Sequence, residues 1–416
     1  MLALVATGLM LAISPLLALL LTHGRPGSAH RTALFSLLIL VPAAYLQIHG
    51  GALSATLSAM SRYPVSIAIY VVSGTTALGS SIVISTQIGV LGAGIGVSVG
   101  AVFLVIGHSL YLRRFGIYVS PRPKALRERA TARFGFYLLA GAALGASLQL
   151  NLAVALSALS RPPGVVTVYS YAYYGVAMML NLSSAPVSVV MLPRLMDALA
   201  TKGRAALRDQ LLAVVPYVFC VLMPMIAGFI AFGKPLLEVL LSPELSQHGI
   251  DQLYGLAIVL TLMVISASLF TLVGSLLLAL REWNKVFYVA VTGVIVHVVA
   301  IYGVARFGAF AVASAHAAAT ALMAVVLLRA TFGSDFVGVL GAVIRRTAPA
   351  FGLSIVFPVV SAGFGAHPSA AAALGGLAVG CVGYGALAVV LWPKVAGPFV
   401  TLARQIRPFR SRTSTA

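Results

Sequence analysis

Long apolar runs, separated by short polar gaps or by gaps that contain Pro and Gly, dominate this chain. One bilayer crossing needs about 20 mainly apolar residues in a helix, so the chain has room for about twelve crossings. The runs predict transmembrane helices at Leu2–Leu21, Thr32–Ala59, Val65–Thr86, Gly89–Leu112, Phe134–Leu159, Val165–Leu192, Leu207–Phe232, Leu253–Leu280, Val286–Ala305, Gly308–Leu328, Thr347–Phe364 and Ala370–Trp392. The second run is longer than a bilayer requires, and Pro42 within it predicts a kink or a break.

Composition agrees with this pattern. Of the 416 residues, 60% are hydrophobic and only 8% are charged, and the mean hydropathy is +1.04. These values exclude a soluble globule, a disordered chain and a nucleic-acid-binding domain. Cys220 and Cys381 both lie inside apolar stretches, so they indicate neither a disulfide framework nor a metal cluster. The pattern predicts an all-α polytopic membrane protein.

The formal net charge of +19 is interpreted as a topology signal. All but five of the 27 Lys and Arg fall in alternate gaps between the predicted helices and in the C-terminal tail. The five on the opposite side are Arg25, Arg31, Arg161, Lys234 and Arg306. Because cytoplasmic loops carry the excess of Lys and Arg, the rich side and the C-terminus are expected to be cytoplasmic, with no nucleic-acid partner.

An internal repeat is indicated when the chain is shifted by 219 residues. Arg62 then coincides with Arg281, Gly74 with Gly293 and Gly89 with Gly308. The repeat spans six helices. Because six is an even number, both copies would start on the same side of the membrane, so they would be parallel and related by an axis along the membrane normal. Met1 corresponds to Cys220, which predicts a first copy that lacks two helices. Alternatively, Met1 is the true start and the first helix is an uncleaved signal anchor.

Soluble-enzyme signatures are absent from the sequence: it contains neither an HExxH zinc motif nor a GxxxxGK[ST] phosphate loop. The small residues at Gly92–Gly96 lie inside a predicted membrane helix, where they let helices pack closely. The connector from Arg113 to Arg133 is rich in cations and predicts an amphipathic surface helix. Its charge can attract anionic lipid head groups or a pyrophosphate, or it can serve orientation alone.

Polar residues inside membrane spans usually face a bundle interior or a cavity, because exposing them to lipid is costly. The candidate substrate-binding residues are Gln149, Asn151, Arg161, Tyr169, Tyr173, Asn181, Ser184, His297 and His316. In the sixth span, the Tyr, Asn and Ser side chains follow three- and four-residue spacing, a stripe suited to stacking and hydrogen bonding with sugars. The alternative is an aromatic belt at the outer interface together with interhelical hydrogen bonds.

The mid-span histidines and the acidic residues bear on ion coupling. His297 and His316 are interpreted either as a proton-linked pair or as separate helix-packing residues. The first four predicted helices contain no Asp or Glu. An exporter of cations would need a buried carboxylate, so this absence disfavours a drug antiporter. We predict no bound cofactor, and leave H⁺ or Na⁺ open as a coupling ion.

Four stretches carry a family resemblance. The run Ala185–Leu211, with the turn Leu192-Pro193-Arg194-Leu195, resembles the multidrug/oligosaccharidyl-lipid/polysaccharide (MOP) exporter superfamily, in which a Pro-containing helix ends in such a turn. Phe232–Glu244 resembles the superfamily's next outer loop. The segments LALREWNKVFYVAVTG and GVARFGAFAVASAHAAATAL are similar to its tenth to twelfth helices.

The resemblance implies a MATE/MOP-like fold with two pseudo-symmetric lobes, the first without its initial two helices. Its domains would be an N-lobe at 1–112, a basic cytoplasmic connector at 113–133, a C-lobe at 134–330, an additional helix pair at 331–393 and a basic cytoplasmic tail at 394–416. On this pattern the fifth and sixth helices border the central cavity. The resemblance thus favours Gln149, Asn151, Tyr173 and Asn181 as substrate contacts.

The resemblance favours the polysaccharide branch. It implies a flippase, not an enzyme, that moves a polyprenyl-diphosphate-linked oligosaccharide across the bacterial inner membrane for exopolysaccharide, capsule or O-antigen synthesis, by alternating access of two lobes. Its partners would be that lipid-linked glycan, membrane lipids and the polysaccharide polymerase machinery, and it would act as a monomer. The alternatives are a MATE-type antiporter of drugs or organic cations, an integral-membrane glycan polymerase or ligase, and a non-transporting scaffold. The polymerase is disfavoured because the longest outer loop, Lys234–Asp251, is short.

Overall fold

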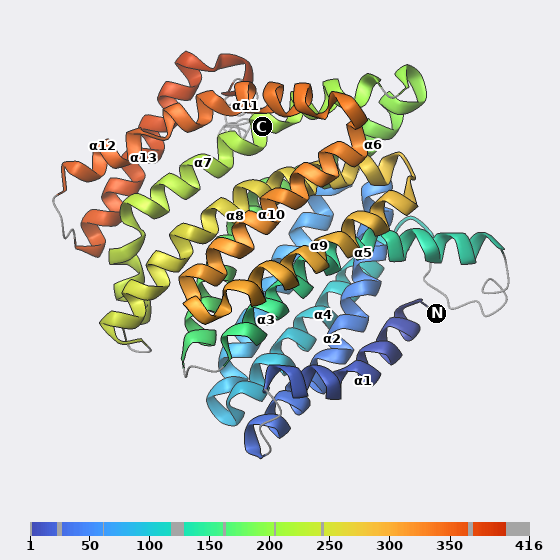
Figure 1. Ribbon diagram of the computed structural model, residues 1–416. Helices are drawn as coiled ribbons and strands as arrows, with labels where there is room; N and C mark the ends of the chain where they lie inside the picture. Colours follow the sequence, from blue (N-terminus) through green and yellow to red (C-terminus); the bar gives the residue numbers. More distant parts are fainter. Residues whose placement is uncertain are drawn as a thin grey trace, which may run out of the picture. The chain divides into compact units, whose positions relative to one another are not determined.

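The computed structural model describes residues 2–22, 27–60, 62–117, 129–160, 164–203, 205–242, 245–364 and 369–396. Within these ranges all regular structure is helical (Figure 1). The helices are α1 (Leu2–Leu21), α2 (Ser28–Ala59), α3 (Tyr63–Ile88), α4 (Val90–Arg113), α5 (Arg129–Leu159), α6 (Val165–Lys202), α7 (Ala205–Leu241), α8 (Gln247–Ala279), α9 (Trp283–Val304), η2 (Ala305–Phe307), α10 (Ala309–Phe332), η3 (Gly333–Asp335), α11 (Phe336–Leu353), α12 (Val356–Ala362) and α13 (Ala370–Leu391). The predicted all-α class is confirmed.

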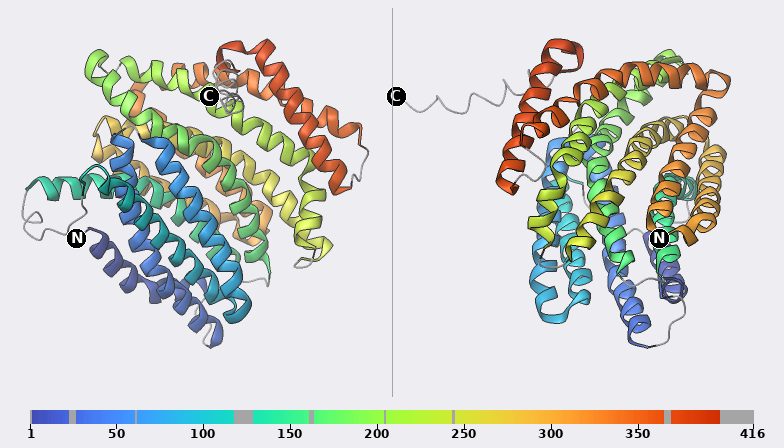
Figure 2. Two further views of the ribbon diagram at one scale, coloured as in Figure 1. Left: turned by 180° about the vertical axis from the view of Figure 1, so that it is seen from behind. Right: turned by 60° about the vertical axis from the view of Figure 1, so that its left-hand side comes forward.

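The chain divides into two compact units, Met1–Pro163 and Gly164–Ala416. In the first unit, α4 packs against both α2 and α3, and α1 contacts α2 and α5. Figure 2 shows α2, α3 and α4 side by side. The sequence instead predicts the boundary at the connector, with Phe134–Leu159 in the second lobe. α5 contacts α1, which is why contacts group it with the first unit.

Glycines of α4 allow α3 and α4 to approach backbone to backbone. A Cβ added to Gly92 would lie 2.5 Å from the backbone nitrogen of Ser85, and one added to Gly96 would lie 2.3 Å from that of Ser81. Atoms cannot approach so closely, so a larger residue would force the helices apart. The interpretation of this glycine stretch as a helix-packing feature is confirmed.

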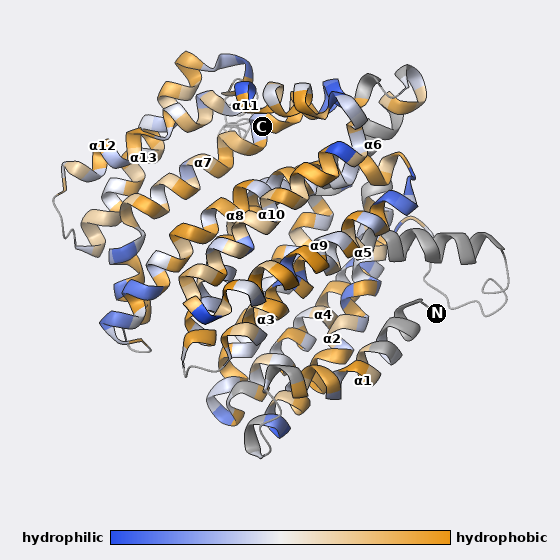
Figure 3. Cartoon of the chain, viewed as in Figure 1, coloured by the Kyte–Doolittle hydropathy of each residue, from blue (hydrophilic) through white to orange (hydrophobic). Residues whose placement is uncertain are grey.

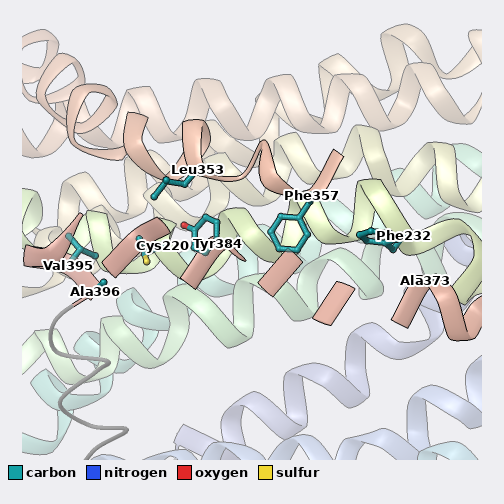
Figure 4. Close-up of a cluster of buried hydrophobic side chains, with 9 residues drawn as sticks. Cys220, Phe232, Leu353, Phe357, Ala373, Tyr384, Val395 and Ala396 are labelled. Atoms are coloured by element: carbon teal, nitrogen blue, oxygen red, sulfur yellow. The ribbon is translucent and has the colours of Figure 1, made fainter. Parts of the chain in front are cut away.

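In the second unit, α8 packs against α6, α7 and α10, and α10 packs against α9. A second layer forms where α11, α12 and α13 pack against α7. Its buried core contains the rings of Phe232, Phe357 and Tyr384 from α7, α12 and α13 (Figure 4). Phe357 stacks beside Tyr384 with ring centroids 6.3 Å apart. Aromatic burial of this kind fixes the helix pair α12 and α13 on α7.

The helix bounds agree with the repeat expected at an offset of 219 residues. Shifted by that offset, α2, α3 and α4 each coincide with α8, α9 and α10 to within one residue at most helix ends. Gly89, between α3 and α4, has φ +66°, and Gly308, before α10, has φ +92°. Only glycine adopts such angles without strain, so both copies use the same kind of turn.

The apolar surface of these helices fits a membrane. Eight segments of the described chain are long and apolar enough to cross a bilayer, and Met10–Leu19 and Ala143–Leu159 form shorter apolar stretches. Hydrophilic residues gather mainly near helix ends (Figure 3). The chain is therefore a multi-pass membrane protein, as the hydropathy pattern predicts.

A break at Pro42 is excluded, because α2 is continuous through that residue. Two other local predictions are wrong. α6 remains helical through the expected turn at Leu192–Leu195 and ends only at Lys202, before Gly203, whose φ is +67°. A proline removes one backbone donor but leaves most of the helix ladder intact, so packing can keep such helices continuous.

The outer loop is also shorter than expected, because α7 extends to Leu241 and Asp251 lies in α8. The apolar residues after Lys234 continue the helix, and Lys234 pairs with Asp251 at 2.8 Å across the two helix ends. Most of the predicted surface helix in the connector lies outside the described residues.

Candidate functional site

A buried polar network connects three helices of the second unit. Tyr169 of α6 and His316 of α10 lie in hydrogen-bond contact, with 3.0 Å between the phenol oxygen and Nδ1. The ring of Tyr173, one turn further along α6, stacks on His316 with centroids 5.6 Å apart. The exposed fractions of Tyr169 and His316 are 0% and 1%. This pair therefore holds α6 and α10 together away from solvent and lipid.

The network continues from α10 to α9. His297 meets the ring of His316 edge to face, with centroids 5.2 Å apart. Its Nε2 lies 3.2 Å from the hydroxyl oxygen of Thr320, and its Nδ1 lies 2.8 Å from the carbonyl oxygen of Gly293. A carbonyl only accepts, so Nδ1 carries the proton and Nε2 accepts in the neutral ring. The two histidines that the sequence singled out are thus neighbours.

The Thr320 hydroxyl has one proton and two possible acceptors. Besides Nε2 of His297, it lies 2.8 Å from the carbonyl oxygen of His316. It can satisfy only one of them at a time. A proton added to His297 would let Nε2 donate to Thr320 while Thr320 donates to His316. Hydrogen bonding in this network therefore depends on the protonation of His297.

A second, smaller contact lies further along α6. Ser184 is buried, and its hydroxyl lies 3.1 Å from the carbonyl oxygen of Leu180 and 3.5 Å from the hydroxyl of Ser268 on α8. By contrast, Asn181 is exposed. The predicted stripe is therefore split: Tyr169, Tyr173 and Ser184 face protein, whereas Asn181 faces outward.

The aromatic-belt alternative fits only part of the tyrosine run. Tyr171 is 46% exposed, as a belt residue would be, whereas Tyr173 is 7% exposed. Burial of alternate tyrosines follows from helical geometry, because residues two apart point in different directions. Tyr169 and Tyr173 thus belong to the interior network.

The candidates on α5 differ from each other in the same way. Gln149 is exposed, whereas Asn151 is fully buried. Within the described part of the chain, neither atom of the Asn151 amide group has a hydrogen-bond partner. An unpaired buried amide costs about 1–3 kcal/mol, so Asn151 is the candidate, among those the structure describes, whose buried polar atoms lack a partner. Arg161 lies outside the described residues.

The first unit contains a related network that the sequence reasoning missed. His108 of α4 is fully buried, and its Nε2 lies 3.1 Å from the hydroxyl of Ser66 on α3. Ser66 in turn lies 2.7 Å from the hydroxyl of Ser54 on α2. As with His297, Nδ1 of His108 lies close to the carbonyl oxygen four residues earlier, at 2.9 Å. A lone histidine in an apolar run was the available signal.

These arrangements provide hydroxyl, imidazole and amide groups inside helical bundles. Groups of these types can form hydrogen bonds with polar ligands. In the described ranges, no group of three or more His, Cys, Asp or Glu side chains could hold a metal ion. The described candidates can therefore act through hydrogen bonds from polar side chains within the membrane spans.

The chain matches a known family. The family model for the lipid II flippase MurJ matches residues 1–362, which include all of the first unit and most of the second. No curated protein sequence matches the chain.

Solved structures show the same fold. A structure titled lipid II flippase MurJ, inward closed conformation, is similar with a TM-score of 0.64 and 14% identity over 94% of this chain and 81% of that one. A MATE in the straight conformation gives a TM-score of 0.55 and 14% identity. A MOP superfamily transporter from Pyrococcus furiosus gives 0.57 and 15%. Each of these two alignments covers 83% of this chain and 77% of the other. The predicted MATE/MOP-like fold is confirmed.

Proposed function

Since this chain belongs to the MurJ lipid II flippase family, a family of transporters and not of enzymes, we propose that it moves a polyprenyl-diphosphate-linked saccharide from the cytoplasmic to the outer leaflet of a bacterial inner membrane. The observation that carries the proposal is the family match over residues 1–362. Lipid II, the substrate in the family's name, is the first substrate to test. An oligosaccharide repeat for exopolysaccharide, capsule or O-antigen, which the sequence resemblance favours, is the second.

The proposed mechanism is alternating access of the two lobes, with the polar groups of the spans contacting the sugar while the lipid tail stays in the bilayer. Asn151 supports this, because an unpaired amide is ready to bond a substrate hydroxyl. The Tyr169–His316 contact supports it in another way. The two side chains bond each other in this conformation, and in another conformation each could bond the substrate instead. Asn181, exposed on α6, is proposed as a further contact.

The proposed topology places the basic gaps and the C-terminus in the cytoplasm. Its support is the charge bias of the sequence. A reporter that is active only in the cytoplasm, fused after residue 396, should be active.

A MATE-type antiporter is the second candidate, because MATE structures share the fold. The absence of Asp and Glu from the sequence of α1–α4 counts against coupling through a carboxylate in those helices.

The deciding experiment measures lipid-linked precursors in cells depleted of this protein, with complemented cells as the control and a panel of cationic drugs alongside. Accumulation of lipid II would support this peptidoglycan precursor as the transported substrate. Accumulation of a lipid-linked oligosaccharide with loss of surface polysaccharide would support the second substrate. Drug sensitivity without either accumulation would favour the antiporter.

A substitution then tests the site. Asn181→Leu is compatible with the bilayer and removes one amide, so export should fall while membrane insertion is unchanged. Normal export would remove Asn181 from the proposed site.

A further inference from the structure

A charged pocket lies at one end of the second unit, between the start of α7, the start of α9, the end of α10 and the middle of α11. We call it the α7–α11 pocket. It has a volume of about 770 Å³, and its charged lining residues are Arg208, Asp209, Lys285, Asp335, Arg345 and Arg346. Four are basic and two are acidic, so the lining is net positive. Apolar side chains, including Leu207, Leu212 and Phe332, complete it.

Intramolecular contacts hold three of the four cations in place. Arg208 bridges to Asp335 at 3.1 Å, from α7 to the 3₁₀ turn η3. Lys285 donates to the carbonyl oxygen of Ala330 at 3.1 Å and pairs with Glu282. The carboxylates of Asp335 and Glu282 balance the charges of Arg208 and Lys285, so the unbalanced positive charge of the lining belongs to Arg345 and Arg346.

Arg346 donates a hydrogen bond to a backbone carbonyl of α7 that a proline leaves without its helical donor. Pro216 has no backbone N–H, so the carbonyl of Leu212, four residues earlier, lacks its helical donor. The Arg346 guanidinium supplies the donor, with 2.8 Å between Nη1 and that oxygen. This bond ties α11 to α7 and holds the charge of Arg346 at the pocket wall.

Arg345 is different. It is exposed, it lines the pocket, and within the ranges that the structure describes it makes no ion pair or hydrogen bond. Asp209, on the opposite element, likewise has no such partner there, and it is the one acidic group left unpaired in the lining. Orientation of the chain in the membrane requires positive charge on one side but not its convergence on a cavity. The guanidinium of Arg345 is thus available to bind an anion, and the orientation of the chain in the membrane does not explain its place in the pocket.

We propose that the α7–α11 pocket binds a phosphoryl group, supplied by the head group of an anionic phospholipid in the adjacent leaflet. Arg345 is the principal ligand, because a guanidinium bonds two phosphoryl oxygens at once. The mixed lining fits such a lipid. The charge of Arg346 adds to that of Arg345 in attracting the head group, and Leu207, Leu212 and Phe332 contact the glycerol and upper acyl region.

The pocket lies where a head group would be. Arg208 is near the beginning of the apolar span Leu207–Leu241, and Phe332 is the last residue of α10. Charged residues at the ends of spans lie at the level of the lipid head groups. The lining contains no residue of the Tyr169–His316 network.

The test uses the delipidated full-length protein and counts bound lipids by native mass spectrometry. The probes are phosphatidylglycerol and, as the zwitterionic control, phosphatidylcholine. We expect phosphatidylglycerol to bind about tenfold more tightly, and Arg345→Gln to remove most of that preference. Arg113→Gln, an equal charge change at an exposed position at the end of α4, is the matched control and should change the preference less than about twofold.

Two further measurements separate the sources of the phosphoryl group and the causes of a loss. Inorganic phosphate is added to the lipid-free protein while thermal unfolding is followed. Stabilisation by phosphate that Arg345→Gln abolishes, without a lipid preference, would assign the pocket to a free phosphate. Arg345→Lys, which keeps the charge but loses the two-pronged geometry, should retain part of the affinity. Equal binding of both lipids without a phosphate effect, or equal losses in Arg345→Gln and Arg113→Gln, would overturn the proposal.

Discussion

The two copies of the repeated helix trio share their bounds but differ in burial. In the span that begins at His30, only 17% of the most apolar window is buried, whereas 61% is buried in its counterpart from Gln247. α8 contacts α6, α7, α9 and α10, whereas α2 contacts α1, α3 and α4. Equal helix lengths therefore do not imply equal surroundings, because the second copy is enclosed by helices of its own unit.

Polar chemistry separates the copies further. In the first copy, Ser54, Ser66 and His108 bond among α2, α3 and α4. In the second, His297 and His316 reach beyond the repeat to Tyr169 on α6. Both networks use a histidine that bonds the carbonyl four residues earlier. The bond from histidine to carbonyl, which both copies have, stabilises a single helix. The contact of His316 with Tyr169, which only the second copy has, links α10 to α6.

The largest expected effect tests the packing of the two copies. A Cβ on Gly96 would clash with the backbone of Ser81, one on Gly293 would meet only the flexible Met323 side chain, and one on Gly74 would meet nothing within 4 Å. We expect Gly96→Ala to destabilise by at least about 1–3 kcal/mol, Gly293→Ala to cost less, and Gly74→Ala to be neutral or stabilising. Thermal unfolding in detergent gives the ranking. Equal stability of all three variants would contradict the close approach of α3 and α4.

The next effect tests whether the contact to α6 matters for transport. Tyr169→Phe removes the hydroxyl that bonds His316 but keeps the ring, so export of the lipid-linked precursor should fall about 3- to 10-fold. Tyr171→Phe, on the exposed face of the same helix, is the control and should leave export within twofold of the unchanged protein. Ser54→Ala tests the first network and should also change export little. Similar losses in all three would show that the networks do not differ in role.

Asn151 allows a test in which stability and activity should move in opposite directions. Asn151→Leu replaces an unpaired buried amide by an apolar group of similar size, so the protein should be stabilised, by up to about 1–3 kcal/mol. Export should fall, because the proposed substrate contact is lost. Gln149→Leu, two residues earlier and exposed, is the control for stability and should leave the free energy of unfolding nearly unchanged. A destabilised Asn151→Leu would mean that the amide is paired in the folded protein.

The smallest effect concerns the ion pair between Lys234 and Asp251 in the second unit. The equivalent positions in the first copy are Pro15 and Thr32, which cannot form it. Both charges are substantially exposed, and exposed pairs add little. Lys234→Gln should shift the unfolding temperature by no more than about 2 °C. A larger shift would give this pair a part in the difference between the copies.

Hydropathy and charge predicted the helical class and most helix bounds, because a bilayer imposes length and apolarity on each span. They failed at Pro193, where a proline was taken to end a helix, since tertiary packing decides whether the chain continues. Periodicity indicated Tyr169, Tyr173 and Ser184 together but could not separate them from Asn181. The pairing of His297 with Thr320 depends on which faces of α9 and α10 meet, which sequence spacing does not contain.

The bond from Arg346 to the carbonyl left unpaired by Pro216 also constrains how this sequence can change over evolutionary time. While Pro216 is present, loss of Arg346 strands a carbonyl inside the protein. Once position 216 regains a backbone N–H, the carbonyl of Leu212 has its helical donor again, and Arg346 is no longer needed for that bond. Replacing Arg346 before Pro216 is therefore expected to cost more stability than replacing Pro216 first.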